Sequence, residues 1–223
     1  MNDADTRRME SFLRAQEFGR LQAARIPRGS FAEELLTRLS GIITNLEQQS
    51  ATQSSGLRTA QQHATGKASA RDEVFLDLRA IARTARGMAI VTPGLEDKFR
   101  IPRDPKDQEL LSAARAFATD AEPLKDEFIR RGLPADFLDD LNADIAAFEQ
   151  AITGQMQGTE THVAATAAID DLIDEGVRTM HELDPVIRNL FADDPATLAQ
   201  WFSARHVERA PRKTKKTTPP PTH

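Results

Sequence analysis

A hydrophobic seam that repeats in steps of three and four residues constrains the fold of this chain more than any other feature. The seam passes through Leu138, Leu141, Ile145, Phe148, Ile152, Gln155, Thr159, His162, Thr166, Ile169, Ile173, Gly176, Met180 and Leu183. Its spacing averages about 3.5 residues, the period that keeps one stripe of a helix against partner helices. The seam therefore predicts a bundle of long helices. Its middle turns polar, which is unusual for a helix with a purely structural role.

The composition supports this fold class. Ala, Arg and Leu are the three commonest residues, and they are among those that lose the least free energy on entering a helix. No stretch alternates β-branched or aromatic residues with polar ones, as a half-buried strand does. We therefore expect an all-α protein, an elongated antiparallel bundle of about four long helices with short terminal helices. We expect it to form a single domain over residues 1–207.

The absence of cysteine excludes disulfides, thiolate metal sites and a cysteine nucleophile. Residues 1–16 carry charges throughout and contain no apolar segment of the kind that forms a secretory signal. No window approaches eighteen apolar residues, the length that a membrane-spanning helix needs. These features predict a soluble, cytoplasmic protein that does not bind a membrane.

Charge is unevenly distributed along the chain. From Arg205 to the end there are six basic residues and one acidic residue, a balance of +5; the whole chain carries −5, so the preceding 204 residues carry −10 by difference. Residues 208–223 have no apolar periodicity and are rich in proline, which predicts a disordered basic tail. Its candidate phosphate contacts are Arg209, Arg212, Lys213, Lys215 and Lys216.

Glycine and proline suggest where the helices begin and end. The pattern predicts helices over residues 5–25, 105–131 and 134–184, with a kink at Pro123 in the second of these. Two Asp-Pro steps after residue 183 mark short terminal helices.

Gly66 separates two alternatives for the remaining helical segment. Ser30 and Glu33 form a capping box that starts this helix. The chain either turns at Gly66 and starts a new helix over residues 70–91, or continues as one helix through both segments. Without a turn, about half of the long helix after Pro134 would leave its seam uncovered. We therefore expect the chain to reverse direction near Gly66.

The longest predicted loop is Thr92–Asp104, and loops of this length are often functional. The interpretation that we favour is that Phe99 and Ile101 close the end of the bundle. The segments TPGLEDKFR, in this loop, and HVERAPR, near the C-terminus, resemble a family of uncharacterised all-helical bacterial proteins. The resemblance spans most of the chain, and it implies no activity and no site residues.

Motifs for catalysis or metal binding are weak. Residues 139–144 and 170–174 resemble the DDxxD motif with which helical prenyl and terpene synthases hold magnesium. These aspartates fall between seam positions, so we expect them to face solvent. No histidine has a glutamate three residues before it, as a di-iron bundle requires. Nucleotide-binding glycine loops and the Gly-x-Ser-x-Gly elbow are also absent. The sequence therefore predicts a non-enzymatic protein without a metal or cofactor.

The polar middle of the seam is a candidate site. Its members are His162, Gln155, Thr159 and Thr166. Such a layer can set helix register, bind a small ligand or hold water, and register is the role that we favour. Ser50, Gln53 and His63 are the expected counterparts on a facing helix.

Leu198, Trp201 and Phe202 are spaced i, i+3 and i+4 on a short helix. They either pack back onto the bundle or dock into a groove of a partner protein. The favoured hypothesis for the whole chain is a non-enzymatic interaction or scaffold module, with an unidentified protein partner or with self-association through its long helices. The alternatives are a nucleic-acid-associated accessory protein that uses the basic tail, and a small-ligand binder that uses the polar layer.

Overall fold

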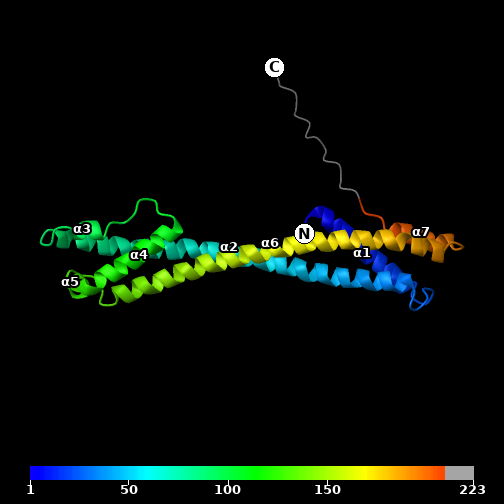
Figure 1. The fold of residues 1–223 in the computed structure, drawn as a ribbon, viewed down its shortest axis with the longest axis horizontal. Helices are drawn as coiled ribbons and strands as arrows, with labels where there is room; N and C mark the ends of the chain where they lie inside the picture. Colours follow the sequence, from blue (N-terminus) through cyan, green and yellow to red (C-terminus); the bar gives the residue numbers. More distant parts are fainter. Residues whose placement is uncertain (209–223) are drawn as a thin grey trace, which may run out of the picture. The chain divides into compact units, whose positions relative to one another are not determined.

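A computed structural model describes residues 1–208; 82% of these residues are helical and none is in a strand. The prediction of an all-α bundle is confirmed. The elements are α1 (Asp3–Leu21), α2 (Phe31–Ala89), α3 (Leu95–Lys98), α4 (Asp107–Ala121), the 3-10 turn η1 (Glu122–Leu124), α5 (Lys125–Arg130), α6 (Phe137–Leu190) and α7 (Pro195–Ala204) (Figure 1). From Arg209 onward, the predicted tail lies outside the described residues.

The described chain divides into two compact units. Unit 1 contains residues 1–53 and 163–208, and unit 2 contains residues 54–162. Each unit has its own cluster of buried hydrophobic side chains. The predicted domain over residues 1–207 therefore contains two hydrophobic cores, and α2 and α6 contribute to both of them.

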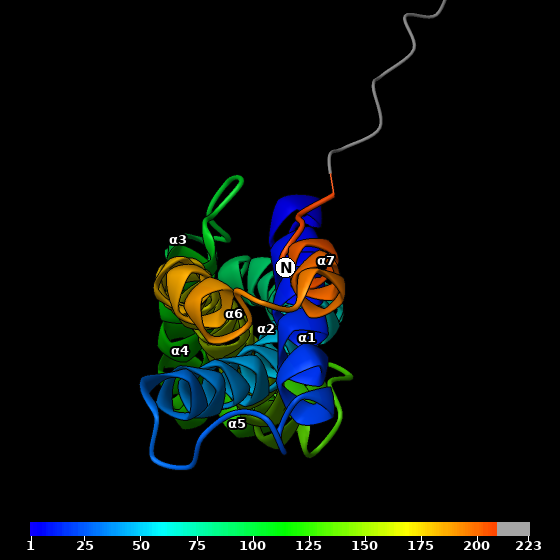
Figure 2. The same ribbon diagram turned by 90° about the vertical axis from the view of Figure 1, so that its right-hand side faces the viewer.

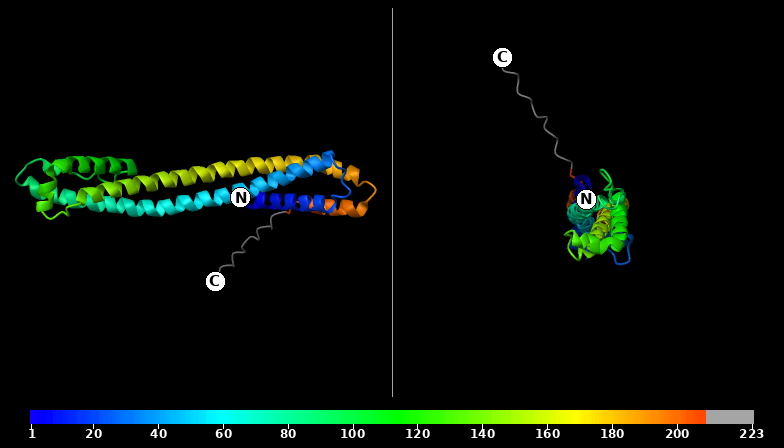
Figure 3. Two further views of the ribbon diagram at one scale, coloured as in Figure 1. Left: turned by 90° about the horizontal axis from the view of Figure 1, so that it is seen from below. Right: turned by 90° about the vertical axis from the view of Figure 1, so that its left-hand side faces the viewer.

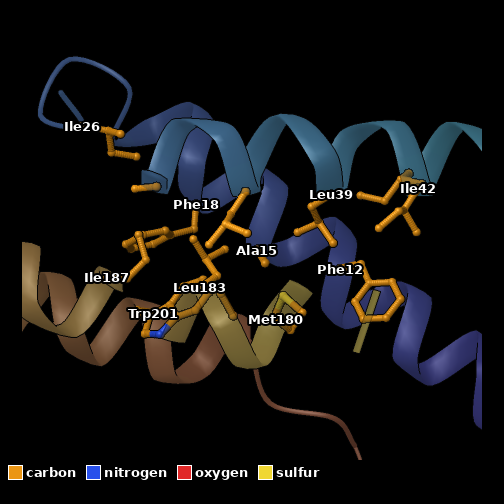
Figure 4. Close-up of a cluster of buried hydrophobic side chains, with 14 of the residues drawn as sticks. Phe12, Ala15, Phe18, Ile26, Leu39, Ile42, Met180, Leu183, Ile187 and Trp201 are labelled. Carbon is orange, nitrogen blue, oxygen red and sulfur yellow. The ribbon is translucent and has the colours of Figure 1, made fainter. Parts of the chain in front are cut away.

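Unit 1 packs α1, α7 and the adjoining parts of α2 and α6 around one core, and Figure 2 shows these four helices together. The side chains that form its centre come from all four helices. They include Phe12, Ala15 and Phe18 of α1, Leu35, Leu39 and Leu46 of α2, Ile169, Ile173, Leu183 and Ile187 of α6, and Trp201 of α7. Figure 4 labels Phe12, Phe18, Leu39, Leu183 and Trp201 among them. Their spacing along α1, α2 and α6 follows steps of three and four residues and places them on one face of each helix, and burial of that face provides most of the stability of such a helix.

Unit 2 packs α4 and α5 against the other parts of α2 and α6. Phe99, in the loop after α3, lies in this core and is 2% exposed. Its ring makes edge-to-face contacts with Phe117 of α4 and Phe128 of α5, with centroid distances of 5.3 and 5.4 Å. The prediction that Phe99 closes a bundle end is confirmed. Ile101 packs on the same cluster and is partly buried.

The two long helices pack together and run antiparallel. In unit 1, Arg38 of α2 pairs with Glu182 of α6 at 3.5 Å, and Gln53 donates a hydrogen bond to Thr166 at 2.8 Å. As the residue number rises along α2, the number of the residue that it contacts on α6 falls, as antiparallel pairing requires.

In unit 2, α2 and α6 approach each other backbone to backbone at two glycines. A Cβ atom added to Gly158 would lie 2.6 Å from the amide nitrogen of Ala60 and 2.9 Å from the carbonyl oxygen of Gly56. A Cβ atom added to Gly56 would lie 2.8 Å from the amide nitrogen of His162. Real Cβ atoms do not approach backbone atoms this closely, so the crossing requires glycine at both positions.

The prediction that the chain reverses at Gly66 is wrong, because α2 continues through this residue to Ala89. Gly66 is exposed and has no neighbour within 4 Å of an added Cβ, so its cost to the helix is limited to the intrinsic preference of glycine, about 1 kcal/mol. The residues that follow also tie α2 to the start of α4. Lys67 and Arg71 pair with Asp107 at 3.0 and 2.6 Å.

Two prolines also act differently from the prediction. The last long helix does not end at Asp184: α6 passes through Pro185 to Leu190, and Leu183 and Ile187 on either side are fully buried. Core packing on both sides of Pro185 therefore outweighs the lost backbone hydrogen bond. Pro123 does not kink a continuous helix, because it lies in η1, which separates α4 from α5.

The glycine crossing predicts opposite effects for the same substitution at two positions. Gly158→Ala should lower the free energy of unfolding by about 1–3 kcal/mol, because its methyl group overlaps the backbone of α2. Gly66→Ala should raise it by up to about 1 kcal/mol, since alanine is the better helix former and open space surrounds the position. Urea unfolding followed by circular dichroism measures both variants. A stabilised Gly158→Ala variant would contradict the close approach.

Candidate functional site

The polar middle of the seam is only partly a buried layer. His162 and Gln155 are half-buried, but Thr159 is exposed and its hydroxyl donates to the Gln155 carbonyl oxygen in its own helix at 2.9 Å. Thr159 is therefore not a member of the layer. In this part of α6 the buried positions are Gly154 and Gly158. The inward face is thus displaced by one residue from the predicted seam.

The expected counterparts on α2 are placed separately in the two units. In unit 1, half-buried Thr166 accepts a hydrogen bond from Gln53, whose side-chain oxygen in turn accepts from the N-terminal amine of Met1. In unit 2, the ring of His63 lies over Gly154, where an added Cβ would be 2.5 Å from the ring. These contacts fix which residues of α2 and α6 face each other, as the register interpretation expects.

A second candidate site lies between α2 and α6 in unit 2, where Asp77 meets Asp144. Burial, followed by the charge of Asp144 and a side-chain hydrogen bond with it, raises the pKa of Asp77 from its ordinary 3.8 to about 7. Asp140 and Glu73 add smaller repulsions. One Asp77 carboxylate oxygen is buried without a hydrogen-bond partner. A carboxyl group that is partly buried beside other carboxylates keeps its proton to a higher pH than a free one.

The sequence interpretation of the aspartates holds for most of them. Asp139 and Asp140 are exposed, and so are the three aspartates of residues 170–174. Asp144 differs, because it is half-buried against α2. Among residues 1–208, no group of three or more histidine, aspartate or glutamate side chains is arranged to hold a metal ion.

Of the three candidate docking residues on α7, Trp201 is a core residue, so the docking prediction is wrong for it. Its side chain is fully buried and its ring lies 5.2 Å from that of Phe18 (Figure 4). Its indole nitrogen donates to a carboxylate oxygen of Asp184 at 2.8 Å, which satisfies the one polar group of the side chain. Leu198 is partly buried against the same core.

Phe202 is the one member of the three that stays exposed, at 42%. The guanidinium groups of Arg188 and Arg205 lie over its ring, 5.8 and 5.5 Å from the centroid. Arg205 also pairs with Asp184 at 3.2 Å. These contacts hold the ring against the side of α7 that faces α6.

An apolar groove runs between α1 and α7 on the outside of unit 1, and Figure 3 shows the two helices side by side. Its volume is about 770 Å³, and its lining residues are Leu13, Arg14, Glu17, Phe18, Leu21, Ala199, Gln200, Ser203 and Ala204. Leu13 and Leu21 are 38% and 63% exposed. We call this surface the α1–α7 face.

This face was not predicted from the sequence. One signal was available. The ten residues of α7, PATLAQWFSA, include no acidic or basic side chain, whereas 28% of the whole chain is charged. A surface helix without charge is unusual for such a chain, and it distinguishes α7 from the other helices of unit 1.

The five candidate phosphate contacts of the tail, Arg209, Arg212, Lys213, Lys215 and Lys216, lie outside the described residues. Within those residues, no helix is both long enough and apolar enough to cross a membrane. Comparisons with protein-family models, curated proteins and solved structures find no match to this chain. The resemblance to an all-helical bacterial family stays a prediction.

The Asp77–Asp144 pair predicts how stability depends on pH. Because the pKa of Asp77 in the folded chain is about 7 and its ordinary value is 3.8, the folded chain holds a proton that the unfolded chain releases between these values. This contribution to stability is therefore complete below about pH 4 and is lost as the pH rises to about 7.

The substitution Asp77→Asn should remove this loss of stability at higher pH. After allowance for solvent screening, we expect the melting temperature of the variant to be about 2–4 °C above that of the parent at pH 8. Near pH 4 the two melting temperatures should be equal. Thermal unfolding at the two pH values measures the difference. Asp72→Asn, at an exposed position of α2, is the control for the change in net charge and should show no such pH dependence. Equal melting temperatures of Asp77→Asn and the parent at pH 8 would contradict the raised pKa of Asp77.

Proposed function

We propose that this protein is a non-enzymatic helical interaction module whose docking surface is the α1–α7 face. The observation that carries the proposal is the combination of an apolar groove with a helix, α7, that bears no charge. Exposed apolar patches of this kind mark binding surfaces, and the centres of protein interfaces are depleted of charged residues.

The inner side of α7 is firmly attached, which leaves its outer side available for binding. Trp201 is buried, and Arg25, in the turn after α1, pairs with Asp194 at 2.9 Å and donates to the Thr197 hydroxyl at 3.0 Å. The backbone N–H of Thr197, then its hydroxyl and Arg25, lower the pKa of Asp194 to about 2. The start of α7 is therefore fixed over the whole physiological pH range, and the groove beside it is preformed.

A preformed groove limits the entropic cost of binding. Three of the four lining residues of α7, Ala199, Ser203 and Ala204, are short and lose little or no rotamer freedom on burial, and Gln200 is the exception. The larger side chains, Leu13 and Leu21, belong to α1. This arrangement suits a helical partner whose apolar side chains pack against Leu13, Leu21 and the small residues of α7.

In-cell photo-crosslinking tests the proposal. A photoreactive amino acid at Leu21 should give discrete covalent adducts, because a docked partner covers this position. The same amino acid at Leu76, which is 55% exposed on α2 in unit 2, is the matched control and should give none. The absence of adducts at Leu21, or equal adducts at both positions, would contradict the α1–α7 face as the docking surface.

The basic tail is the basis of a second candidate function, that of an accessory protein bound to nucleic acid. Five basic residues attract phosphates, and their effect is additive and weakens steeply with salt. The exposed aspartates of residues 170–174 oppose this attraction from unit 1.

Deletion of residues 210–223 separates this role from the first. The truncated protein should keep its melting temperature within about 1 °C, because the deleted residues have no apolar periodicity with which to pack. If the tail binds nucleic acid, the intact chain should bind duplex DNA at low salt in a fluorescence anisotropy titration and the truncated chain should not. The absence of binding by both forms would remove the nucleic-acid role. A large loss of stability would instead show that the tail packs on the helices.

A further inference from the structure

We infer that the partner on the α1–α7 face is a second copy of this chain, bound by two-fold symmetry. The inference rests on the proposed function and names the partner of the same surface. A two-fold interface must be complementary to itself, because each copy contributes the same patch. The α1–α7 face meets this requirement in its shape, its charge and its direction.

The shape of the face combines a ridge with a floor. Leu13 and Leu21 are eight residues apart on α1, so about 12 Å separates them along one side of the helix. Ala199 and Ser203, four residues apart on α7, present only small side chains to the same groove. Helices usually pack with the large side chains of one over the small side chains of the other. One copy of the chain presents both, with large side chains on α1 and small ones on α7.

The charge of the face does not oppose association of like copies. α7 is uncharged, and Glu17 and Arg20 on α1 neutralise each other through a 2.7 Å ion pair. Arg14 is directed at its own chain, where it donates to the carbonyl oxygens of Ala204 and His206. The chain as a whole carries −5, so most of its surface repels a second copy more strongly than this face does.

The direction of the helices fixes how the copies meet. Within one copy, Phe18 contacts Trp201 and Arg14 bonds to Ala204, so α1 and α7 are antiparallel. By this register, Leu21 lies across the groove from Ala199. A two-fold axis along the groove therefore lays α1 of each copy on α7 of the other, with Leu21 of one copy against Ala199 of the second.

The size of the face indicates a weak, reversible dimer. α7 has ten residues and is about 15 Å long, and two adjacent helices are about 20 Å wide, so the footprint is roughly 300 Å² per copy. Stable interfaces bury about 800 Å² per partner. We therefore expect a dissociation constant between about 10 μM and 1 mM.

Sedimentation equilibrium of the purified chain, from about 1 μM to about 1 mM, measures this association. The parent should shift from monomer toward dimer across the range. Leu21→Lys should weaken the dimer at least about tenfold, because it places a charge on the uncharged α7 of the second copy. Leu21 is the last residue of α1, where a lysine favours the helix dipole, so folding should be unaffected. Leu76→Lys is the matched control and should dimerise like the parent.

Cysteine trapping tests the arrangement itself. The chain has no cysteine, so any disulfide between copies comes from the introduced residues. A mixture of Leu21→Cys and Ala199→Cys proteins should form a mixed disulfide dimer under mild oxidation. A mixture of Leu76→Cys and Ala199→Cys should not exceed the level of random collision.

The remaining outcomes distinguish this inference from the proposed function. A chain that stays monomeric up to about 1 mM overturns the second copy as partner, while adducts at Leu21 in cells would still support an interaction module. A dimer that Leu21→Lys and Ala199→Lys leave unchanged forms through another surface and also overturns the inference. If the chain is monomeric and Leu21 gives no adducts in cells, both proposals fail.

Discussion

The backbone contact between Gly56 and Gly158 is the constraint on which the pairing of the long helices in unit 2 depends. Buried leucine, isoleucine and phenylalanine hold α2 and α6 together within each core, but large side chains would separate the helices where the glycines meet. Glycine instead lets the two backbones touch, so that dispersion and weak Cα–H···O contacts replace hydrophobic burial. This close approach has a cost in stability, because glycine in a helix interior is less favourable than alanine.

The apolar ends of the seam could be predicted from the sequence, whereas its middle could not. Leu138 to Phe148 and Ile169 to Leu183 show the helical period because large side chains fill both cores. Between them the inward positions include Gly154 and Gly158, which carry no hydrophobic signal, so the period appears to run through Gln155 and Thr159. Because glycine carries no hydrophobic signal, the sequence also led to the wrong prediction of a turn at Gly66. A glycine that ends a helix, one that permits a crossing and one that is merely exposed look alike in a single sequence.

The candidate docking residues show a similar limit. Leu198, Trp201 and Phe202 form one apolar stripe in sequence, and its spacing fits both a core and a partner groove. Asp184, seventeen positions before Trp201, decides between the two for the tryptophan, because its carboxylate accepts the indole hydrogen bond inside unit 1. Such a pairing across a chain reversal cannot be found from periodicity. The absence of charge along α7 is visible in the sequence, and it points to this helix without showing which of its sides is exposed.

The inner side of α7 therefore contributes to stability, and its outer side is the one that we propose for binding. Trp201, Thr197 and Asp194 attach its inner side, while Ala199 and Ser203 on the outer side contribute little to folding because they are small and exposed. Leu21 is likewise 63% exposed, so most of its apolar surface gains nothing from the fold of one copy. That surface becomes favourable only when something covers it. A single chain thus leaves unburied the side chains that a second copy would bury, and changes to them should alter association while leaving unit 1 folded.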